Sequence, residues 1–419
     1  MRATVRPGPC RGAVTIPPSK SLSHRAVICA CLAPGESLVR HAAASRDLEA
    51  TIAGMRCLGA RIERRGDDLL IQGGNPFRPV GQRVDCGESG STLRFFIPLF
   101  ALSGAETSFT GQGRLLQRPQ QVYAELFRQR GLTFEQGAAE LNIAGALTPG
   151  HYALPGDVSS QFITGLLLAL PLLPGDSLIS IRPPFESRSY VGLTLEAMAA
   201  FGVQAYWVNP NELRVPGGQS YRAGIYEVPG DDSQMAFFAV LGAIAGEADC
   251  LGVARESRQG DRVILDILRR FGAEILPIPG GFRVRRGELR GGEIDLSDCP
   301  DLGPILTVLG MYARGQTRIY NAGRLRYKES DRIAAMEAEL GKLGAHILSG
   351  PAELCVWGEP PYAGGTARSQ NDHRVAMSLA VAAAAAAGPV TIEQAEAVQK
   401  SYPGFFTDLQ ALGIEVRLA

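Results

Sequence analysis

The chain has 419 residues, of which 45% are hydrophobic and 20% are charged, and its 42 basic and 42 acidic side chains give a formal net charge of zero. This composition is typical of a soluble globular protein long enough for two domains with full cores. The balanced charge argues against a general nucleic-acid or membrane surface, so any cationic site must be local.

Targeting signals and metal motifs are not evident in the sequence. The N-terminal residues 1–7 have no apolar core, and the longest apolar runs, 163–173 and 375–387, are interpreted as buried helices because one contains prolines and the other is alanine-rich. The eight cysteines include no C-x-x-C pair, which disfavours a zinc site. We therefore expect a cytoplasmic protein with reduced thiols, no metal and no membrane contact.

The first predicted helix is apolar and covers 26–32, after the stretch Ile16-Pro17-Pro18-Ser19-Lys20-Ser21-Leu22-Ser23-His24-Arg25. Pro18 cannot continue a helix backwards, and Ser19 or Ser21 is a good N-cap. A helix start offers free backbone N–H groups and a positive dipole end, so the added cations Lys20 and Arg25 favour an anion receptor. A capped helix with two surface cations explains these ten residues equally well.

A glycine that follows an amphipathic stretch and precedes an alternating strand recurs six times along the chain. These glycines are Gly59, Gly131, Gly202, Gly272, Gly344 and Gly413, and subtracting neighbouring positions gives spacings of 72, 71, 70, 72 and 69. Each glycine suits a helix C′ position with a positive φ angle. A period of about 70 residues predicts six repeats of strands and two helices. The last repeat stops after one strand, so we expect Met1–Val5 to supply its missing strand.

A second series of polar clusters recurs about half a repeat away, and each cluster opens an apolar segment. Its members are 19–21, 87–92, 156–161, 230–234, 298–303 and 370–374. They are interpreted as N-caps of buried helices, although they are longer than capping requires. If the repeats are arranged alike, these helix starts converge.

The repeats divide the chain into two halves of three. We predict one domain over 18–228 and a second over 1–17 plus 229–419, with two hinge crossings near 17–20 and 226–229. A cleft between such halves is a common place for a ligand, and the double crossing predicts that the halves close on it.

Seven motifs in this order resemble those of the 5-enolpyruvylshikimate-3-phosphate synthase family, also called 3-phosphoshikimate 1-carboxyvinyltransferases. The motifs are Pro18-Ser19-Lys20-Ser21-Leu22-Ser23-His24-Arg25, Gly87-Glu88-Ser89-Gly90-Ser91-Thr92-Leu93-Arg94, Gln117-Arg118-Pro119, Pro155-Gly156-Asp157-Val158-Ser159-Ser160-Gln161-Phe162, Leu325-Arg326-Tyr327-Lys328-Glu329-Ser330-Asp331-Arg332, Asn371-Asp372-His373-Arg374 and Lys400-Ser401-Tyr402-Pro403. They span nearly the whole chain, and seven in order are highly specific.

The resemblance implies an α/β fold, a two-domain inside-out α/β barrel of six βαβαββ-like units, three per domain. It also implies a transferase of the shikimate pathway and aromatic amino acid biosynthesis. Phosphoenolpyruvate would give its enolpyruvyl group to the 5-hydroxyl of shikimate 3-phosphate through a tetrahedral adduct that releases phosphate. This reaction uses no metal or organic cofactor, and we expect a monomer. Two polyanionic substrates explain the local cations, and proton transfer at C3 explains paired acids and bases.

The resemblance also implies a role for individual residues. Catalysis would use Asp301, Glu329 and Lys20, with Asp301 accepting the 5-hydroxyl proton and Glu329 moving protons at C3. The shikimate 3-phosphate ligands would be Lys20, Ser21, Arg25, Ser159, Ser160, Gln161, Ser187, Asp301 and Lys328. The phosphoenolpyruvate ligands would be Lys20, Gly90, Arg118, Gln161, Arg332, Arg374 and Lys400. On residue type alone, Asp301 reads as an N-cap and 328–332 as a solvated helix face.

Three positions have no assigned role. Glu88 stands where common members have Asn, which puts inhibition by glyphosate in doubt, and Asn321 and Gln234 are left open. The alternatives are the sister enzyme that transfers enolpyruvate to UDP-N-acetylglucosamine and a non-catalytic repeat protein that binds ligands. The first is disfavoured because no cysteine lies between Cys86 and Cys250, where the sister enzyme has a reactive one. The second would not require Asp301 and Glu329 beside seven cations.

Overall fold

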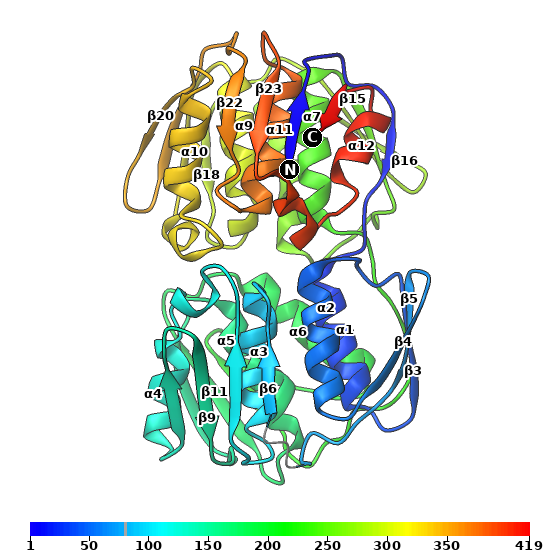
Figure 1. Ribbon diagram of the computed structural model, residues 1–419, viewed down its shortest axis with the longest axis vertical. Coiled ribbons are helices and arrows are strands. Elements are labelled where there is room, and N and C mark those ends of the chain that lie inside the picture. Colours follow the sequence, from blue (N-terminus) through cyan, green and yellow to red (C-terminus); the bar gives the residue numbers. More distant parts are fainter. Residues whose placement is uncertain (79–81) are drawn as a thin grey trace. The chain divides into compact units, whose positions relative to one another are not determined.

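The computed structural model describes residues 1–78 and 82–419, drawn in Figure 1. The chain forms two compact units, unit 1 (Met1–Pro17 and Pro229–Ala419) and unit 2 (Pro18–Val228). Each unit has its own hydrophobic core. The hinge function of the two crossings stays a prediction.

In the described residues, six four-stranded sheets share one plan, with one parallel pairing at one edge and two antiparallel pairings beside it. In unit 2 the sheets are β14 (Ile225–Glu227), β3 (Glu36–Arg40), β5 (Asp68–Gln72), β4 (Arg61–Arg65); β6 (Gln82–Asp85), β7 (Thr107–Thr110), β9 (Glu140–Ala144), β8 (Thr133–Gln136); and β10 (His151–Pro155), β11 (Ser177–Arg182), β13 (Glu212–Val215), β12 (Tyr206–Asn209). In unit 1 they are β16 (Glu274–Ile278), β17 (Gly281–Arg285), β15 (Glu247–Leu251), β2 (Ala13–Thr15); β18 (Glu293–Asp295), β19 (Gly315–Tyr320), β21 (Leu354–Gly358), β20 (His346–Ser349); and β22 (Gly365–Arg368), β23 (Val390–Glu393), β1 (Arg2–Val5), β24 (Val416–Leu418).

Each repeat contributes one buried and one amphipathic helix. The buried helices are α1 (Lys20–Leu32), α3 (Gly90–Phe100), α5 (Ser160–Ala169), α7 (Asp232–Ala245), α9 (Gly303–Tyr312) and α11 (His373–Ala384). The amphipathic helices are α2 (Arg46–Cys57), α4 (Gln121–Gln129), α6 (Arg188–Ala200), α8 (Ile264–Phe271), α10 (Arg332–Gly341) and α12 (Phe405–Ala411). Short 3₁₀ turns are η1 (Leu115–Gln117), η2 (Leu170–Leu172), η3 (Gly260–Val263), η4 (Pro300–Leu302), η5 (Gly323–Tyr327) and η6 (Ala395–Lys400). The βαβαββ order confirms the predicted α/β fold class.

The N-terminal strand completes the last repeat, as predicted. β1 lies between β23 and β24 and pairs antiparallel with both. The ends of the chain meet there, because Arg2 and Ala419 exchange backbone hydrogen bonds of 2.7 and 2.9 Å. Figure 1 shows this first strand among the last elements of the chain.

The six repeat glycines have the positive φ angles that their helix-end positions predict, from 68° at Gly131 to 107° at Gly272. α1 begins at Lys20, directly after Ser19, which is one of the two predicted N-caps, and the apolar stretch 26–32 forms the rest of the helix. Ser19 caps it by accepting a hydrogen bond from the Leu22 amide. The polar residues 20–25 therefore form the first turns of the helix.

The expectation that the two long apolar runs form buried helices is confirmed. The apolar runs 163–173 and 375–387 fall mainly in α5, η2 and α11, whose side chains are nearly all buried. Among the described residues, no helix has the length and apolar character needed to span a bilayer. Cys86 and Cys299 are buried core residues.

Replacing a repeat glycine by alanine tests the backbone requirement in unit 2. Gly59 has a φ of +92°, and a Cβ there would meet nothing within 4 Å, so Gly59→Ala introduces only left-handed strain. We expect the free energy of unfolding of unit 2 to fall by about 1 kcal/mol and its melting temperature in calorimetry to fall with it. Gly192 lies within α6 and also has open space around a Cβ. Gly192→Ala should raise the midpoint, and a lowered midpoint in both variants would contradict this explanation.

Candidate active site

The starts of the buried helices in unit 2 are joined by a chain of side-chain hydrogen bonds. His24 Nδ1 lies 2.7 Å from Thr51 Oγ1, Thr51 lies 2.7 Å from Thr92 Oγ1, and Thr92 donates to Ser89 Oγ at 2.7 Å. The chain runs from α1 through α2 to the N-cap of α3. Burial, with the cations Lys20 and Arg25, holds the pKa of His24 well below its ordinary value. The neutral form of His24 is therefore favoured, and its ring belongs to this hydrogen-bonded chain.

Lys20 stands in the first turn of α1 and is held by a carboxylate that the sequence analysis missed. Its Nζ lies 2.7 Å from Asp47 Oδ2, and both side chains are mostly buried. Asp47 lies in the first turn of α2, behind the N-cap Ser45. An acidic residue in the first turn stabilises a helix start. The local sequence therefore explains Asp47 as a helix-stabilising residue and does not reveal its contact with Lys20.

Arg25 is buried between three helices. Its guanidinium donates to Thr194 Oγ1 at 2.8 Å, to Thr164 Oγ1 at 3.3 Å and to the Ser21 carbonyl at 2.6 Å. Burial lowers the pKa of Arg25 to about 10. The structure thus places Arg25 beside Ser21, its predicted partner, and gives its charge neutral oxygen acceptors.

Gln161 joins the start of α5 to that of α3. Arg94 donates to Gln161 Oε1 at 2.8 Å, and Gln161 Nε2 donates to Ser91 Oγ at 2.9 Å, so the orientation of the amide is fixed. A Cβ added to Gly90 would lie 2.7 Å from Arg118 Nη1 and 3.6 Å from Gln161 Oε1. The predicted residues Gly90, Arg118 and Gln161 are therefore neighbours, and a side chain at position 90 would displace the Arg118 guanidinium.

The predicted serines lie at helix starts. Ser159 caps α5 by accepting a hydrogen bond from the Gln161 amide at 3.3 Å, and Ser160 is the first residue of that helix. Ser187 is the N-cap residue of α6 and has a φ of 53°. A positive φ is uncommon for a residue other than glycine and is often found at functional sites.

Asp301 is the centre of a charged cluster in unit 1. Its carboxylate lies 2.9 Å from Arg374 Nη2, 3.2 Å from Arg332 Nη1 and 3.2 Å from Lys328 Nζ. It lies in η4 and is not the N-cap of α9, which is Leu302. The capping explanation of Asp301 is therefore wrong, and the interpretation of 328–332 as a solvated face is also wrong because Arg332 is 1% exposed.

Two further carboxylates complete this cluster. Arg332 Nε lies 2.9 Å from Asp372 Oδ2, and Arg332 Nη2 lies 2.7 Å from Glu329 Oε2. Asp372 also caps α11, where its side chain accepts from the Arg374 amide at 2.9 Å. From the sequence, Asp372 is recognised only as a member of the motif 371–374. Its contact with Arg332 joins residues 40 positions apart and is not evident from the motif.

The starts of α7 and α11 meet through Arg374. Its Nη2 donates to Ser233 Oγ at 3.0 Å and its Nη1 to the Asp301 carbonyl at 3.1 Å. Lys400, at the end of η6, donates to the Asn371 carbonyl in the loop before α11. Unit 1 therefore gathers all of its predicted site residues, which are Asp301, Lys328, Glu329, Arg332, Arg374 and Lys400.

The electrostatic balance of the cluster favours the ionised forms of Asp301 and Arg332. Burial raises the pKa of Asp301, but Arg374, Lys328 and Arg332 outweigh burial and hold that pKa well below the ordinary value. Burial also lowers the pKa of Lys328, and Asp301 only partly offsets this effect. For Arg332 the three carboxylates outweigh burial and raise the pKa.

The side chains of Glu329, Asp372 and His373 bring three potential metal-ligand atoms within 4.8 Å of one another. Both carboxylates already contact the Arg332 guanidinium. A cation there is a better partner for a substrate anion than for a metal ion, so the donor set does not fit a metal.

The three unassigned positions lie outside these contacts. The Glu88 carboxylate lies close to Gly113, because a Cβ added to Gly113 would lie 2.5 Å from Glu88 Oε2. Asn321 donates to Asp295 Oδ1 at 3.0 Å. Gln234 is 1% exposed, and its amide atoms have no hydrogen-bond partner among the described residues.

Comparisons with known proteins agree on one family. The family model described as EPSP synthase (3-phosphoshikimate 1-carboxyvinyltransferase) matches residues 5–409. A 3-phosphoshikimate 1-carboxyvinyltransferase of Clostridium kluyveri is 43% identical over 99% of this chain and 97% of its own length. One of Clostridium perfringens is 42% identical, with 98% of each chain covered.

Solved structures show the same fold. The EPSP synthase of Acinetobacter baumannii matches with a TM-score of 0.82 and 28% identity over the full length of both chains. The enolpyruvyl transferase NikO of Streptomyces tendae has a TM-score of 0.81 over 99% of this chain and 98% of its own, and at 17% identity it supports the fold alone. The fold is thus one that enolpyruvyl transferases use. The sequence matches are more specific, and the chain belongs to the EPSP synthase (3-phosphoshikimate 1-carboxyvinyltransferase) family.

The lowered pKa of Asp301 predicts how unit 1 responds to acid. A carboxyl whose pKa is depressed by folding stabilises the fold above its ordinary value of 3.8, and this contribution is lost as the pH falls through the lower folded value. Asp301→Asn leaves three cations together. Breaking a buried ion pair lowers the free energy of unfolding by several kcal/mol. Because the Asp301 side chain keeps 20% exposure, we expect a small loss of this kind, about 3 kcal/mol near neutral pH.

Calorimetric melting of unit 1 between neutral and strongly acidic pH measures this effect. The gap between the wild-type and Asp301→Asn midpoints should stay constant down to about pH 4 and then shrink. Asp266→Asn is the matched control, because Asp266 pairs with Arg269 at the surface with 69% exposure. A gap that closes well above pH 4 would contradict the depressed pKa.

Proposed function

We propose that this chain transfers the enolpyruvyl group of phosphoenolpyruvate to the 5-hydroxyl of shikimate 3-phosphate and releases phosphate. Membership of the EPSP synthase family supports the reaction. The observation that carries the proposal is the cluster in which the Asp301 carboxylate contacts Arg374, Arg332 and Lys328. It combines anion-binding cations with a possible base, which is what a reaction between two polyanions requires.

In this proposal, unit 2 supplies mainly hydroxyl and amide groups for shikimate 3-phosphate. The start of α5 would hold its 3-phosphate, because Ser159, Ser160 and the free helix N–H groups are typical of phosphate sites. Ser21, Arg25, Ser187 and Gln161 would complete the contacts. Gly90 and Arg118 would bind phosphoenolpyruvate, since the missing Cβ at Gly90 leaves the backbone accessible.

Unit 1 would supply the charges. Arg332, Arg374 and Lys400 would bind the carboxylate and phosphate of phosphoenolpyruvate, and Lys328 would contact shikimate 3-phosphate. Lys20 of unit 2 would contact both substrates. Before substrate binds, Lys20 and these arginines already have carboxylate partners. A substrate must therefore compete with Asp47, Asp372 and Asp301 for them, which favours ligands with two anionic groups.

The same competition would prepare Asp301 to act as a base. In the structure three cations stabilise its ionised form. When phosphoenolpyruvate takes part of their charge, that stabilisation declines and the proton affinity of Asp301 rises. Asp301 then accepts the 5-hydroxyl proton as the oxygen attacks C2, while C3 gains a proton.

Collapse of the tetrahedral adduct expels phosphate and removes one proton from C3. Glu329 would give a proton to C3 in the addition and take one back in the elimination, and its contact with Arg332 orients the carboxyl group. No electrons are gained or lost in these steps, so acid–base groups suffice and the proposal includes no cofactor. We also expect the chain to act as a monomer in the cytoplasm.

A phosphate-release assay distinguishes this reaction from the alternatives. We expect phosphate release from phosphoenolpyruvate to depend on shikimate 3-phosphate and to be absent with UDP-N-acetylglucosamine. Turnover with the UDP-sugar would identify the sister activity, and release with neither acceptor would support a non-catalytic protein. Gel filtration of the same preparation tests whether the chain is a monomer in solution.

Asp301→Asn should separate binding from turnover. The amide keeps the size of the side chain but cannot accept the hydroxyl proton, so we expect kcat to fall by about 10²- to 10⁴-fold. Calorimetric titration with shikimate 3-phosphate should still show binding. Asp298→Asn, at an exposed position in the same loop, is the matched control and should retain turnover. Near-normal kcat in Asp301→Asn would remove Asp301 from the proton path.

A further inference from the structure

A pocket of about 890 Å³ lies at the C-terminal ends of α7, α9 and α11. Ser233 and Arg374 lie in the first turns of α7 and α11, and Asp301 lies in η4 just before α9, so the pocket is at the other end of unit 1's central helices from the charged cluster. The pocket is walled by the helix ends, the segment 7–9, the loop 286–290 and Pro360-Pro361. Its volume is in the range of small-molecule sites, which is about 300–1,000 Å³.

Two arginines at this pocket are free to bind an anion. Among the described residues, the side chains of Arg286 and Arg314 have no hydrogen bond or ion pair, whereas Arg290 lies 3.7 Å from Glu288. Their backbones are held in place, because the Arg286 amide donates to the Gly246 carbonyl and the Arg314 amide to the Leu289 carbonyl, each at 2.8 Å. The guanidinium groups therefore extend from fixed points on the wall.

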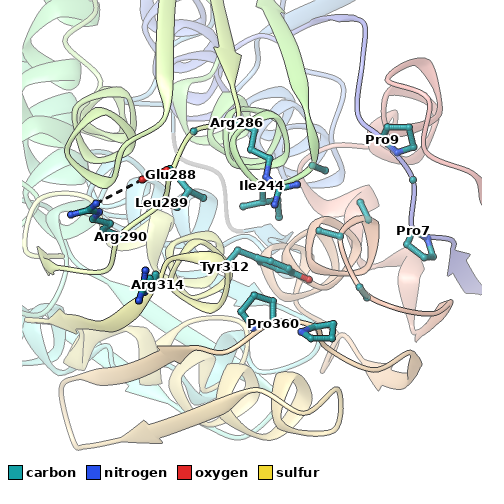
Figure 2. A pocket seen from close by; sticks show the side chains of 17 residues that line it. Pro7, Pro9, Ile244, Arg286, Glu288, Leu289, Arg290, Tyr312, Arg314 and Pro360 are labelled. Atoms are coloured by element: carbon teal, nitrogen blue, oxygen red, sulfur yellow. Dashed lines mark ion pairs between the residues drawn. The ribbon is translucent and has the colours of Figure 1, made fainter.

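Besides the charged residues Arg286, Glu288, Arg290 and Arg314, the lining includes an apolar part. Ile244 and Leu289 are 4% and 8% exposed. The Tyr312 ring packs edge-on against Tyr362 at 5.3 Å, and its hydroxyl donates to the Ala382 carbonyl at 2.8 Å, so the ring is held at both ends. Figure 2 shows Arg290 and Arg314 on one side of Tyr312, with Pro7 and Pro9 on the other.

The arginines also have a purely structural explanation. The C-terminal ends of three helices are negative, and nearby cations stabilise them. That role needs no cavity and no flat apolar wall beside the cations. A ligand with an anionic group and an apolar body would use both features, since guanidinium groups bind carboxylates in paired hydrogen bonds.

We propose that this pocket binds a small organic carboxylate with an apolar ring. The carboxylate pairs with Arg286 and Arg314, and the ring lies against Tyr312 and the neighbouring prolines. The site is separate from the proposed enolpyruvyl transfer, and its test does not depend on that activity.

Fluorine NMR with 4-fluorobenzoate as the probe tests the proposal on the full chain. We expect the probe signal to broaden and shift at millimolar concentration, with binding weakened by about tenfold in Arg286→Gln and in Arg314→Gln. Arg270→Gln, an exposed arginine on α8, is the matched control and should bind like the wild type. The neutral analogue 4-fluorobenzamide should bind about tenfold more weakly.

Three outcomes would overturn the proposal. They are no binding at millimolar concentration, equal binding in all three arginine variants, and displacement of the probe by phosphoenolpyruvate, which would place it at the charged cluster. Turnover of Arg286→Gln and Arg314→Gln without probe should equal that of the wild type, because neither residue belongs to the proposed catalytic site. If these variants lose turnover as well, the pocket is not a separate site.

Discussion

A helix that begins inside a protein must find partners for its free backbone N–H groups, and this requirement governs the polar interior of both units. Serine or aspartate caps five of the six buried helices, and side chains of the same clusters then contact one another. The sixth, α9, begins after the η4 turn that holds Asp301. A structural need thus brings hydroxyls, carboxylates and cations to one end of each unit's central helices.

Lys20, Arg332 and Arg374 are paired with carboxylates within the protein before any ligand arrives. Asp47 accompanies Lys20, and Asp301 and Asp372 accompany Arg374 and Arg332. Without these carboxylates, several buried cations would repel one another and weaken the fold. The internal ion pairs therefore stabilise the protein. They also select among ligands, because a ligand with a single negative charge binds an arginine little better than the carboxylate that already pairs with it.

The fold could be predicted largely from the sequence because its rules are local. Glycine at a helix end needs a positive φ, and polar clusters before apolar runs mark helix starts, so Gly59 and its five counterparts revealed the repeat. The strand at 2–5 was found because the last repeat was one strand short. Ser19 could be named as an N-cap of α1 because Pro18 cannot continue the helix backwards, although the polar residues 20–25 left only 26–32 recognisable as an apolar helix.

The site could be predicted only through the resemblance to a family. Asp301 taken alone had the pattern of a cap, and Asp47 that of an ordinary first-turn acid. What distinguishes them is contact with cations 27 to 73 residues away. Such pairings depend on tertiary packing, and no pattern within one segment reveals them.

The position of β1 also matters while the chain is being synthesised. Unit 2 is one continuous segment and can fold once residue 228 has left the ribosome. β1 is translated before unit 2, whereas its partners β23 and β24 are translated after it. β1 therefore stays without these partner strands while unit 2 is synthesised and folds, and the final sheet of unit 1 closes only when β23 and β24 have been translated.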